Sequence, residues 1–243
     1  MDGEGRTAIV TGAGKRVGAV VAATLLEQGW TVLAHVHRSS DDVPAGAVKV
    51  AAELSDPGCA EAILGAAEGL PPVRLLVNNA ARFAHDALTS FEPSELDAHM
   101  AVNLRAPILL TAGLAATHQG GDAAVVNILD SKVAAPNADF LSYTLSKQAL
   151  AGFTELSARE LAPKGIRVNA VAPALMLRSP GQSEANFEAM HRRNPLGRGV
   201  EPEDVAAAVV YLADARAVTG QTIILDAGQG FDPPPRDVQF LEE

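Results

Sequence analysis

The chain is poor in cysteine, in aromatic residues and in positive charge. Cys59 is its only cysteine in 243 residues, so no internal disulfide can form and a reducing compartment is favoured. Aromatic residues make up 4% of the chain, and its formal net charge is −10. Because Lys and Arg never form a run longer than two residues, a nucleic-acid partner is not expected.

Long apolar runs and a recognisable leader are also lacking. No run approaches the roughly 20 apolar residues that span a bilayer. The first ten residues, MDGEGRTAIV, are polar and acidic before they become strand-like, whereas a signal peptide needs a positive region and an apolar stretch. We therefore expect a cytoplasmic protein with no membrane partner.

The apolar residues that are present predict an α/β fold. They make up 48% of the chain, which with so few aromatics indicates a core of Ala, Val and Leu, typical of buried parallel strands covered by helices. Apolar runs of strand length alternate with segments of helical periodicity. The runs occupy residues 7–11, 31–36, 48–52, 75–78, 124–129, 167–172 and 222–226. The pattern predicts a single domain over residues 1–243, with a Rossmann-type doubly wound parallel sheet of about seven strands flanked by helices.

Two segments do not fit this alternation. Residues 175–199 are irregular or weakly helical, and such an insertion forms either a substrate lid or an ordinary surface helix pair. Residues 232–243 contain three consecutive prolines, which exclude a helix or a central strand there. In a parallel sheet ligands bind beyond the carboxyl ends of the strands, so the site is expected in the loops that follow them.

A glycine-rich turn, TGAGKRVG, joins the first strand to a helix that begins near Val17. Gly12, Gly14 and Gly18 allow a sharp turn and a close approach to an anion, and the helix directs free N–H groups toward a pyrophosphate. The turn would otherwise be a simple tight connection. In the context of a strand and a helix it predicts a dinucleotide site.

The end of the second strand, HVHRSS, indicates which dinucleotide binds. A site that prefers NAD usually has an acidic residue here for the ribose hydroxyls, but this chain has His37, Arg38 and Ser39. Arg38 can pair with a 2′-phosphate, and Lys15 or Arg16 can add a second positive charge. NADPH is therefore predicted over NADH, unless these residues form only a solvated strand end.

Tyr143 and Lys147 are four residues apart on a predicted helix that starts near Ser142, so they share one face. A phenol with an ordinary pKa of about 10 exchanges protons poorly near neutrality. We expect the ammonium of Lys147, together with the positive nicotinamide ring of the oxidised cofactor, to lower the pKa of Tyr143, which then protonates the atom made negative by an arriving hydride. A Tyr and a Lys at this spacing also occur by chance in many helices. The pair indicates a catalytic site because it follows the fifth predicted strand of a nucleotide-binding sheet.

Over about residues 6 to 230 the chain resembles the short-chain dehydrogenase/reductases. The matching motifs are TGAGKRVG, VNNAA at 77–81, Asn103 in VNLRAP, YTLSK at 143–147 and IRVNAVAP at 166–173. The resemblance implies that Asn79 and its neighbours line the adenosine side, that Asn103 supports a water in a proton relay, and that Lys147 holds the nicotinamide ribose. It also implies a homotetramer.

Four departures from the family pattern resemble its pteridine reductase and dihydromonapterin reductase branch. Arg16 replaces a glycine, Asp130 replaces a serine, Phe83 follows NNAA, and HVHRSS ends the second strand. Pro173-Ala174 also replaces the usual Pro-Gly. The branch implies that Phe83 stacks on a pterin ring and that Asp130, Tyr143 and Lys147 handle protons.

Two of these assignments have alternatives. Asp130 suits a substrate with N–H donors and basic ring nitrogens, or a carboxyl group kept protonated by burial, but it could instead turn away and cap the next segment. Phe83 could be only a core or lid aromatic.

The candidate site can now be stated in full. The predicted catalytic residues are Asn103, Asp130, Tyr143 and Lys147, and the predicted substrate contacts are Phe83, Asp130 and Tyr143. The predicted cofactor-binding residues are Gly12, Gly14, Lys15, Arg16, Val17, Gly18, His37, Arg38, Ser39, Glu53, Leu54, Asn79, Ala80, Tyr143, Lys147 and Pro173. No metal is expected, because the six histidines lack a ligand pattern, and Cys59 is expected to be a small buried residue.

These residues predict an NADPH-dependent oxidoreductase that transfers hydride to a C=O or C=N group of a small molecule, with a pteridine as the leading substrate. A general carbonyl or 3-oxoacyl-thioester reductase is the alternative within the family. A cofactor-binding sensor or scaffold without turnover is the alternative outside enzymes, and the intact set of Asn103, Tyr143 and Lys147 argues against it.

Overall fold

The computed structural model describes residues 5–179 and 181–241. Within them, seven strands form one parallel sheet in the order β3-β2-β1-β4-β5-β6-β7. The strands are β1 (Thr7–Val10), β2 (Thr31–Val36), β3 (Val48–Ala51), β4 (Val73–Asn78), β5 (Ala123–Ile128), β6 (Ile166–Pro173) and β7 (Thr222–Leu225). The predicted doubly wound α/β fold is confirmed, and each predicted strand lies within two residues of an observed one.

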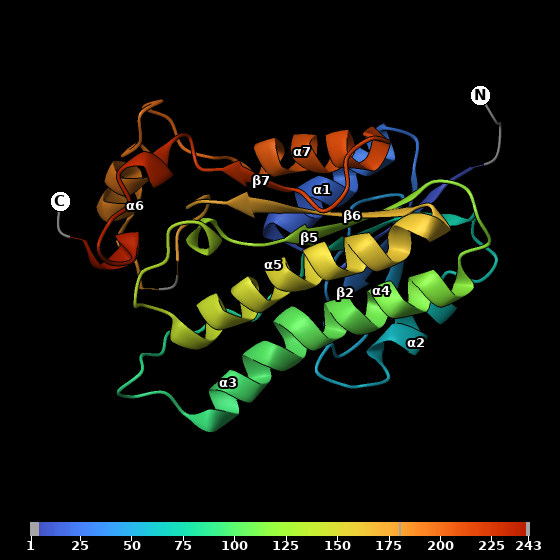
Figure 1. The fold of residues 1–243 in the computed structure, drawn as a ribbon, viewed down its shortest axis with the longest axis horizontal. Helices are drawn as coiled ribbons and strands as arrows, with labels where there is room; N and C mark the ends of the chain where they lie inside the picture. Colours follow the sequence, from blue (N-terminus) through green and yellow to red (C-terminus); the bar gives the residue numbers. More distant parts are fainter. Residues whose placement is uncertain (1–4, 180, 242–243) are drawn as a thin grey trace.

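Helices cover both faces of the sheet. They are α1 (Arg16–Glu27), α2 (Cys59–Gly65), α3 (Pro93–Met100), α4 (Ala106–Thr117), α5 (Leu141–Leu161), α6 (Glu184–His191) and α7 (Pro202–Asp214). Short 3-10 turns are η2 (Ser131–Val133), η3 (Ala162–Lys164), η4 (Gln229–Phe231) and η5 (Val238–Phe240), and η1 (Ala101–Arg105) is a π-helix. The helices α1 and α7 lie on one face of the sheet, and α2, α4 and α5 lie on the other (Figure 1).

The strands are apolar on both sides because both sides are covered. In β1, Ala8 and Val10 pack toward α1 and α7, whereas Ile9 between them packs toward α2 and α4. Side chains of a strand alternate between the two faces, so an unbroken apolar run supplies both cores. The strands therefore appear in the sequence as continuous runs of apolar residues and not as an alternation of apolar and polar residues.

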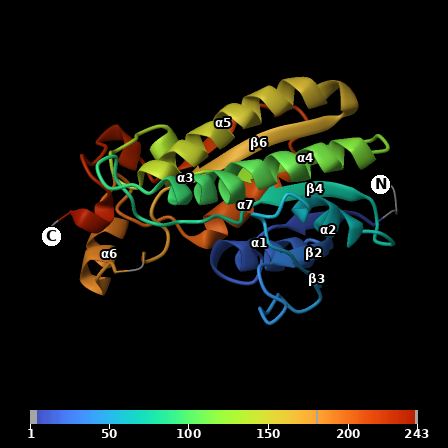
Figure 2. The same ribbon diagram turned by 90° about the horizontal axis from the view of Figure 1, so that it is seen from below.

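A continuous rod formed by α3, η1 and α4 covers part of the sheet (Figure 2). By length and composition its 25 residues, Pro93–Thr117, could cross a membrane. In the fold, however, Leu110 and Leu114 of α4 are buried in the core beside α2 and the sheet. The apolar character of the rod is therefore accounted for by its packing.

The sheet order reverses between β1 and β4. From β1 the chain moves outward through β2 to β3, and β4 then returns to the other side of β1. The loops after β1 and β4 therefore leave the sheet toward opposite faces and open a crevice at their carboxyl ends. The glycine-rich turn and the segment that starts at Asn79 follow these two strands.

The two segments that lacked a predicted structure lie side by side beyond the carboxyl ends of the strands (Figure 1). Among the described residues of 175–199, α6 is the only helix, so a pair of helices is not formed there. The prolines at 233–235 lie between η4 and η5, as their missing N–H groups require. Residues 1–4, 180 and 242–243 lie outside the described residues.

Candidate active site

A cavity of about 1140 Å³ opens beyond the carboxyl ends of the strands. It brings together most of the residues predicted from sequence, although they are spread over the whole chain. Those that line it are Gly12, Gly14, Lys15, Arg16, Val17, Gly18, His37, Arg38, Glu53, Leu54, Asn79, Ala80, Phe83, Asp130, Tyr143, Lys147 and Pro173. Among the described residues, two predicted members do not line it, namely Ser39 and Asn103.

The glycine-rich turn packs too tightly for side chains. Gly12 has φ +67°, and a Cβ on Gly18 would lie 2.2 Å from the carbonyl oxygen of Gly12. Asn79, which follows β4, fastens the turn because its Nδ2 donates to the carbonyl oxygen of Thr11 at 2.7 Å. The backbone at Gly12 and Gly18 is therefore free of side chains where α1 begins, so that an anion can approach it closely, as a pyrophosphate site needs.

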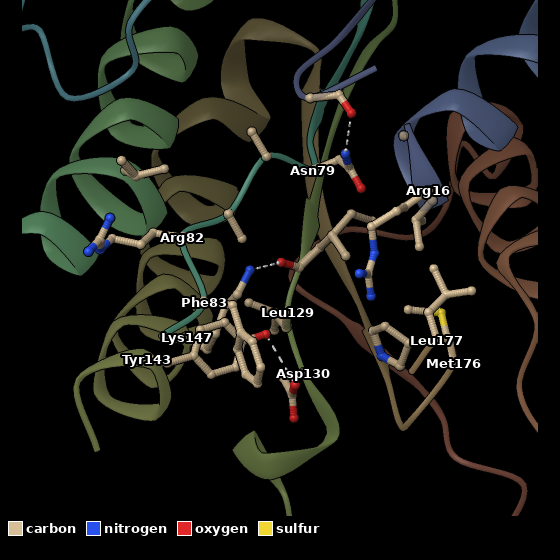
Figure 3. Close-up of a pocket in the computed structure, with 18 of the residues that line it drawn as sticks. Arg16, Asn79, Arg82, Phe83, Leu129, Asp130, Tyr143, Lys147, Met176 and Leu177 are labelled. Carbon is tan, nitrogen blue, oxygen red and sulfur yellow. Dashed lines mark hydrogen bonds between the residues drawn. The ribbon is translucent and has the colours of Figure 1, made fainter. Parts of the chain in front are cut away.

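Arg16 adopts a left-handed backbone conformation at this turn, with φ +53°. That conformation favours glycine, and a residue with a side chain adopts it only at an energetic cost. In Figure 3 the side chain of Arg16 points from the start of α1 into the cavity. The residue with the strained backbone, Arg16, is thus the one that places a positive charge at the expected pyrophosphate site.

His35, which had no predicted role, connects the turn to the sheet. The N–H of Gly12 donates to its Nδ1 at 3.2 Å, so Nε2 carries the proton and donates to the carbonyl oxygen of Ala52 at 3.1 Å. Burial lowers the pKa of His35 below its ordinary value of 6.5, because the charged form is poorly solvated there. A neutral imidazole therefore holds the turn in place.

The strand end beside His35 presents polar groups to the cavity. His37 pairs with Glu53 at 2.7 Å, and the exposed Arg38 lies next to them on the cavity wall. Ser40 lines the wall in place of Ser39, whose carbonyl oxygen accepts a hydrogen bond from Lys49. Arg38, the cation expected to bind a 2′-phosphate, therefore lines the cavity. The serine that lines it is Ser40, whereas Ser39 was predicted.

Asp130 and Tyr143 form a hydrogen bond at the other end of the cavity (Figure 3). The Tyr143 hydroxyl donates to Oδ2 of Asp130 at 3.1 Å, and the backbone N–H of Lys132 donates to Oδ1 at 2.9 Å. Asp130 thus caps η2 and also faces the phenol, so the two alternatives for this residue are compatible. Burial raises the pKa of the Asp130 carboxyl above its ordinary value, which favours its protonated form.

The ammonium of Lys147 by itself does not lower the pKa of the phenol. Burial, followed by the charge of Asp130, raises the pKa of Tyr143 well above 10. The ammonium of Lys147 donates instead to the carbonyl oxygen of Ile128 at 2.6 Å, and burial lowers its own pKa to about 8. Tyr143 therefore keeps its proton and is arranged as a donor.

Asn103 is a buried brace behind the cavity. Its Oδ1 accepts from the N–H of Arg82 at 2.7 Å, and its Nδ2 donates to the hydroxyl of Ser146 at 2.9 Å. It lies in the π-helix η1, and such bulges often occur at functional sites. Asn103 joins the loop after β4 to α5 and so fixes the helix that carries Tyr143.

The start of α5 is fixed by a carboxylate from another segment. Asp86 accepts hydrogen bonds from the N–H of Ser142 at 3.0 Å and from its hydroxyl. An acidic acceptor at a helix N-terminus satisfies free N–H groups and suits the helix dipole. Phe140, the residue just before α5, has a left-handed backbone conformation with φ +57°. Tyr143 therefore begins its helix in a tightly defined position.

Aromatic rings surround Tyr143. Phe83 stacks on Phe140 with ring centroids 4.4 Å apart and meets the edge of Tyr143 at 4.8 Å. Phe83 is 40% exposed and lines the cavity, so it is not a core residue. A flat ring system could lie against this corner with its polar atoms near Asp130.

Three further residues of this region carry no motif in the sequence: Lys132, Phe140 and Asp237. Lys132 follows Asp130 by two residues and Asp237 lies in the proline-rich tail, and both line the cavity. In the sequence Lys132 and Asp237 look like ordinary charged residues, and only the fold places them near Asp130 and Tyr143. Cys59 is buried in α2, and burial raises the pKa of its thiol, as suits a core residue.

Comparison with known proteins gives a family model and several relatives for this chain. Residues 12–229 match the family model described as enoyl-(acyl carrier protein) reductase. L-xylulose reductase of Bos taurus is 34% identical over 92% of this chain and 96% of its own length. Pteridine reductase 1 of Leishmania tarentolae is 30% identical over 91% and 95%.

One solved structure is similar to this chain in both fold and sequence. It is the alternative dihydrofolate reductase 1 (FolM) of Brucella suis in complex with NADP, with a TM-score of 0.86 and 35% identity over 94% of this chain and 96% of that one. The similarities include members of the pteridine-reductase-like branch that the sequence resembles. The chain belongs to the short-chain dehydrogenase/reductase family.

Proposed function

We propose that this NADP-dependent short-chain oxidoreductase reduces a ring C=N bond of a pteridine-type substrate. The observation that carries the proposal is the partly buried hydrogen bond between Asp130 and Tyr143, beside the exposed ring of Phe83. Two similar proteins support it by name, a pteridine reductase and an alternative dihydrofolate reductase.

The residues at the first end of the cavity fit NADP. The backbone at the start of α1 is an anion site, and a Cβ at Gly14 or Gly18 would collide with the carbonyl oxygen of Asp42 or of Gly12, respectively. Lys15, Arg16 and Arg38 add positive charge along the same wall. The similar Brucella suis structure holds NADP, and we infer that Arg38 meets the 2′-phosphate and makes NADPH the preferred form.

Bound NADPH supplies a hydride. Tyr143, which retains its proton because its pKa is raised, then donates that proton to the ring nitrogen that gains negative charge. Asp130 is hydrogen-bonded to the phenol and favours its own protonated form, so it can return a proton to Tyr143. The ammonium of Lys147 stays on the side of β5, where it holds Ile128 and adds positive charge near the reacting atoms.

The carboxyl group at position 130 favours a nitrogen-containing ring over a ketone. Once Asp130 has passed its proton to Tyr143 it is an ionised carboxylate, which would repel a developing alkoxide. A nitrogen-containing ring avoids this conflict, because ring N–H groups can donate to the carboxylate and basic ring nitrogens can take a proton from the carboxyl form. A hydroxyl group would be sufficient for carbonyl reduction. Asp130 is therefore best explained by proton transfer to and from a heterocycle.

A carbonyl reductase is the second candidate function. It is favoured by the similarity to L-xylulose reductase, which by its name acts on a sugar ketone. The two functions predict different substrates for the same site, so they are separable by assay. A thioester reductase has less support, because the corner formed by Phe83 and Phe140 suits a flat ring.

A panel of substrates tests the proposal. Dihydropteridines, dihydrofolate, xylulose, simple ketones and acetoacetyl thioesters are offered with NADPH and with NADH, and cofactor oxidation is followed at 340 nm. We expect turnover of dihydropteridines with NADPH at a kcat/KM at least about tenfold above that of any ketone, equivalent to about 1.4 kcal/mol. Exclusive use of ketones or thioesters would refute the pteridine assignment.

We further propose that residues 1–243 act as one dinucleotide-binding domain, with 175–199 as a lid over the site. The described residues Leu175, Met176 and Leu177 line the cavity, which supports this role. A cytoplasmic location remains a prediction from the sequence, and a homotetramer remains what the family resemblance implies. Sedimentation of the purified enzyme measures the assembly directly.

A further inference from the structure

A fully buried histidine, His99, lies beside Tyr143 and has no part in the proposed chemistry. It is 0% exposed and stands near the end of α3, with its ring centre 6.4 Å from that of Tyr143. Its neighbours Ala98 and Val102 line the cavity, so His99 lies behind the cavity wall. Burying an imidazole costs desolvation energy unless its polar atoms are paired, and its partners therefore indicate what it does.

Both ring nitrogens of His99 are hydrogen-bonded. Nε2 accepts from the backbone N–H of Ala84 at 3.3 Å, and Nδ1 lies 2.8 Å from the carbonyl oxygen of Glu95. Because a carbonyl oxygen can only accept, Nδ1 carries the proton and the imidazole is neutral. An apolar side chain of similar size would leave the N–H of Ala84 without this acceptor.

His99 is the middle member of a stripe on the rod, formed by Glu95, His99 and Asn103 at intervals of four residues. Side chains at this interval share one face of a helix, and all three hold the segment that follows β4. Glu95 accepts from the Arg82 guanidinium at 2.7 and 3.1 Å. Asn103 accepts from the N–H of Arg82 and donates to its carbonyl oxygen. The side chain of Arg82 accordingly points toward the green helices in Figure 3.

Residues 82–86, which we call the clamp segment, present alternate groups to two sides. The N–H groups of Arg82 and Ala84 are directed to the rod. The ring of Phe83 between them meets the edge of the Tyr143 ring, with 4.8 Å between ring centres. A displacement of Ala84 would therefore move Phe83 relative to the phenol, although neither residue belongs to α5.

We propose that His99 is a positioning residue for the reaction. By accepting from the N–H of Ala84 it fixes the clamp segment against the rod, and it thereby sets the position of Phe83 against the Tyr143 phenol. The inference rests on the proposed role of Tyr143 as proton donor, and it is independent of which substrate receives the proton. A misplacement of about 1 Å can lower a rate by about 10²-fold, so one hydrogen bond behind the wall can control turnover.

The first measurement detects the position of Tyr143 without turnover. The chain has two tyrosines, and isotope labelling of their rings lets NMR observe Tyr143 together with Tyr211, which is 56% exposed on α7. In His99→Leu the signals of Tyr143 should shift, because the ring current of Phe83 acts on it at close range, while those of Tyr211 stay in place. His99→Gln should restore the original shifts, since a glutamine carbonyl can accept from Ala84.

The second measurement is kinetic, with NADPH and the substrate of the panel that is reduced fastest. We expect His99→Leu to lower kcat at least about tenfold and to change the Kd for NADPH less than about twofold, because the glycine-rich turn is untouched. His99→Gln should recover at least half of kcat. His118→Leu is the matched control, since it removes an imidazole from the outer end of α4 and should leave kcat unchanged.

The outcomes decide the role of His99 separately from the proposed function. Unshifted Tyr143 signals or an unchanged kcat in His99→Leu would overturn the positioning role. Parallel losses of kcat, NADPH affinity and thermal stability would also overturn it, because they indicate a general loss of folding. If His99→Gln does not recover, the hydrogen bond to Ala84 is not the cause and the inference is wrong. If the panel gives no turnover, the proposed function fails, and the shifts of Tyr143 alone support or overturn the inference.

Discussion

At the scale of single residues, the chemistry depends on which groups hold protons. Tyr143 is buried, Asp130 is partly buried, and both have raised pKa values, whereas Lys147 is buried with a pKa lowered to about 8. Burial favours the neutral form of each. The cluster is therefore prepared to donate a proton rather than to remove one, which suits reduction of the substrate.

Removal of the phenol hydroxyl tests the proton donor. Tyr143→Phe should lower kcat by roughly 10²–10⁴-fold, the usual range for general acid catalysis. The Kd for NADPH should change little, because the hydroxyl bonds to Asp130 and not to the cofactor wall. Both quantities are measured on the same preparation, by stopped-flow reduction and by NADPH fluorescence. Retention of half the activity would contradict the mechanism.

Asp130→Ser converts the site toward the common family pattern. It should reduce dihydropteridine turnover at least about tenfold, or about 1.4 kcal/mol of transition-state stabilisation. Ketone reduction should be spared or improved, because no carboxylate can then form at this position and repel a developing alkoxide. The ratio of the two activities is the measurement, since a misfolded variant would lose both. An unchanged ratio would show that Asp130 only caps η2.

At the scale of elements, the turn between β1 and α1 contains a strained residue that lowers the stability of the fold but places a cation at the cofactor site. Arg16 is left-handed at φ +53° where a glycine would be relaxed. Strain of this kind costs on the order of 1–2 kcal/mol, and it persists because the side chain reaches the cavity. Backbone geometry alone would select a different residue at this position.

Arg16→Gly should therefore separate stability from affinity. We expect the midpoint of thermal unfolding to rise by about 2–4 °C, the shift for about 1 kcal/mol in a chain of this size. The Kd for NADPH should rise about tenfold because a cation is lost from the anion site. Arg16→Ala is the control: it loses the charge but keeps the strain, so affinity should fall without a gain in melting temperature. A rise in melting temperature for both variants would count against the strain.

At the scale of the whole molecule, stability should depend on pH through His35. Its pKa in the folded protein is below 6.5, so the unfolded chain binds more protons in the window between the two values. The stabilisation is complete above pH 6.5 and is lost as the pH falls toward the folded pKa. Protonation of Nδ1 would also break the bond from Gly12.

His35→Gln tests this linkage. The free energy of unfolding, measured by urea titration between pH 5 and pH 7.5, should decline less steeply below pH 6.5 in the variant than in the unmodified protein. His118→Gln, a change at a histidine on the outer end of α4, should leave the decline as it was. Equal slopes in all three proteins would refute the role of His35. His37 and Glu53 lie close to His35 and are unchanged in each protein.

The sequence by itself determined the seven-stranded sheet, the glycine-rich turn and the placement of Tyr143 and Lys147 one turn apart on the same helix, because these depend on local periodicity and on spacing along one helix. The tertiary structure alone decided the raised pKa of Tyr143, since burial and the neighbouring Asp130 are not encoded in local spacing. It also decided that Asn103 braces α5 behind the cavity wall. Asp237 meets Lys132 across a long stretch of sequence, and contacts between distant segments arise only when the whole chain packs.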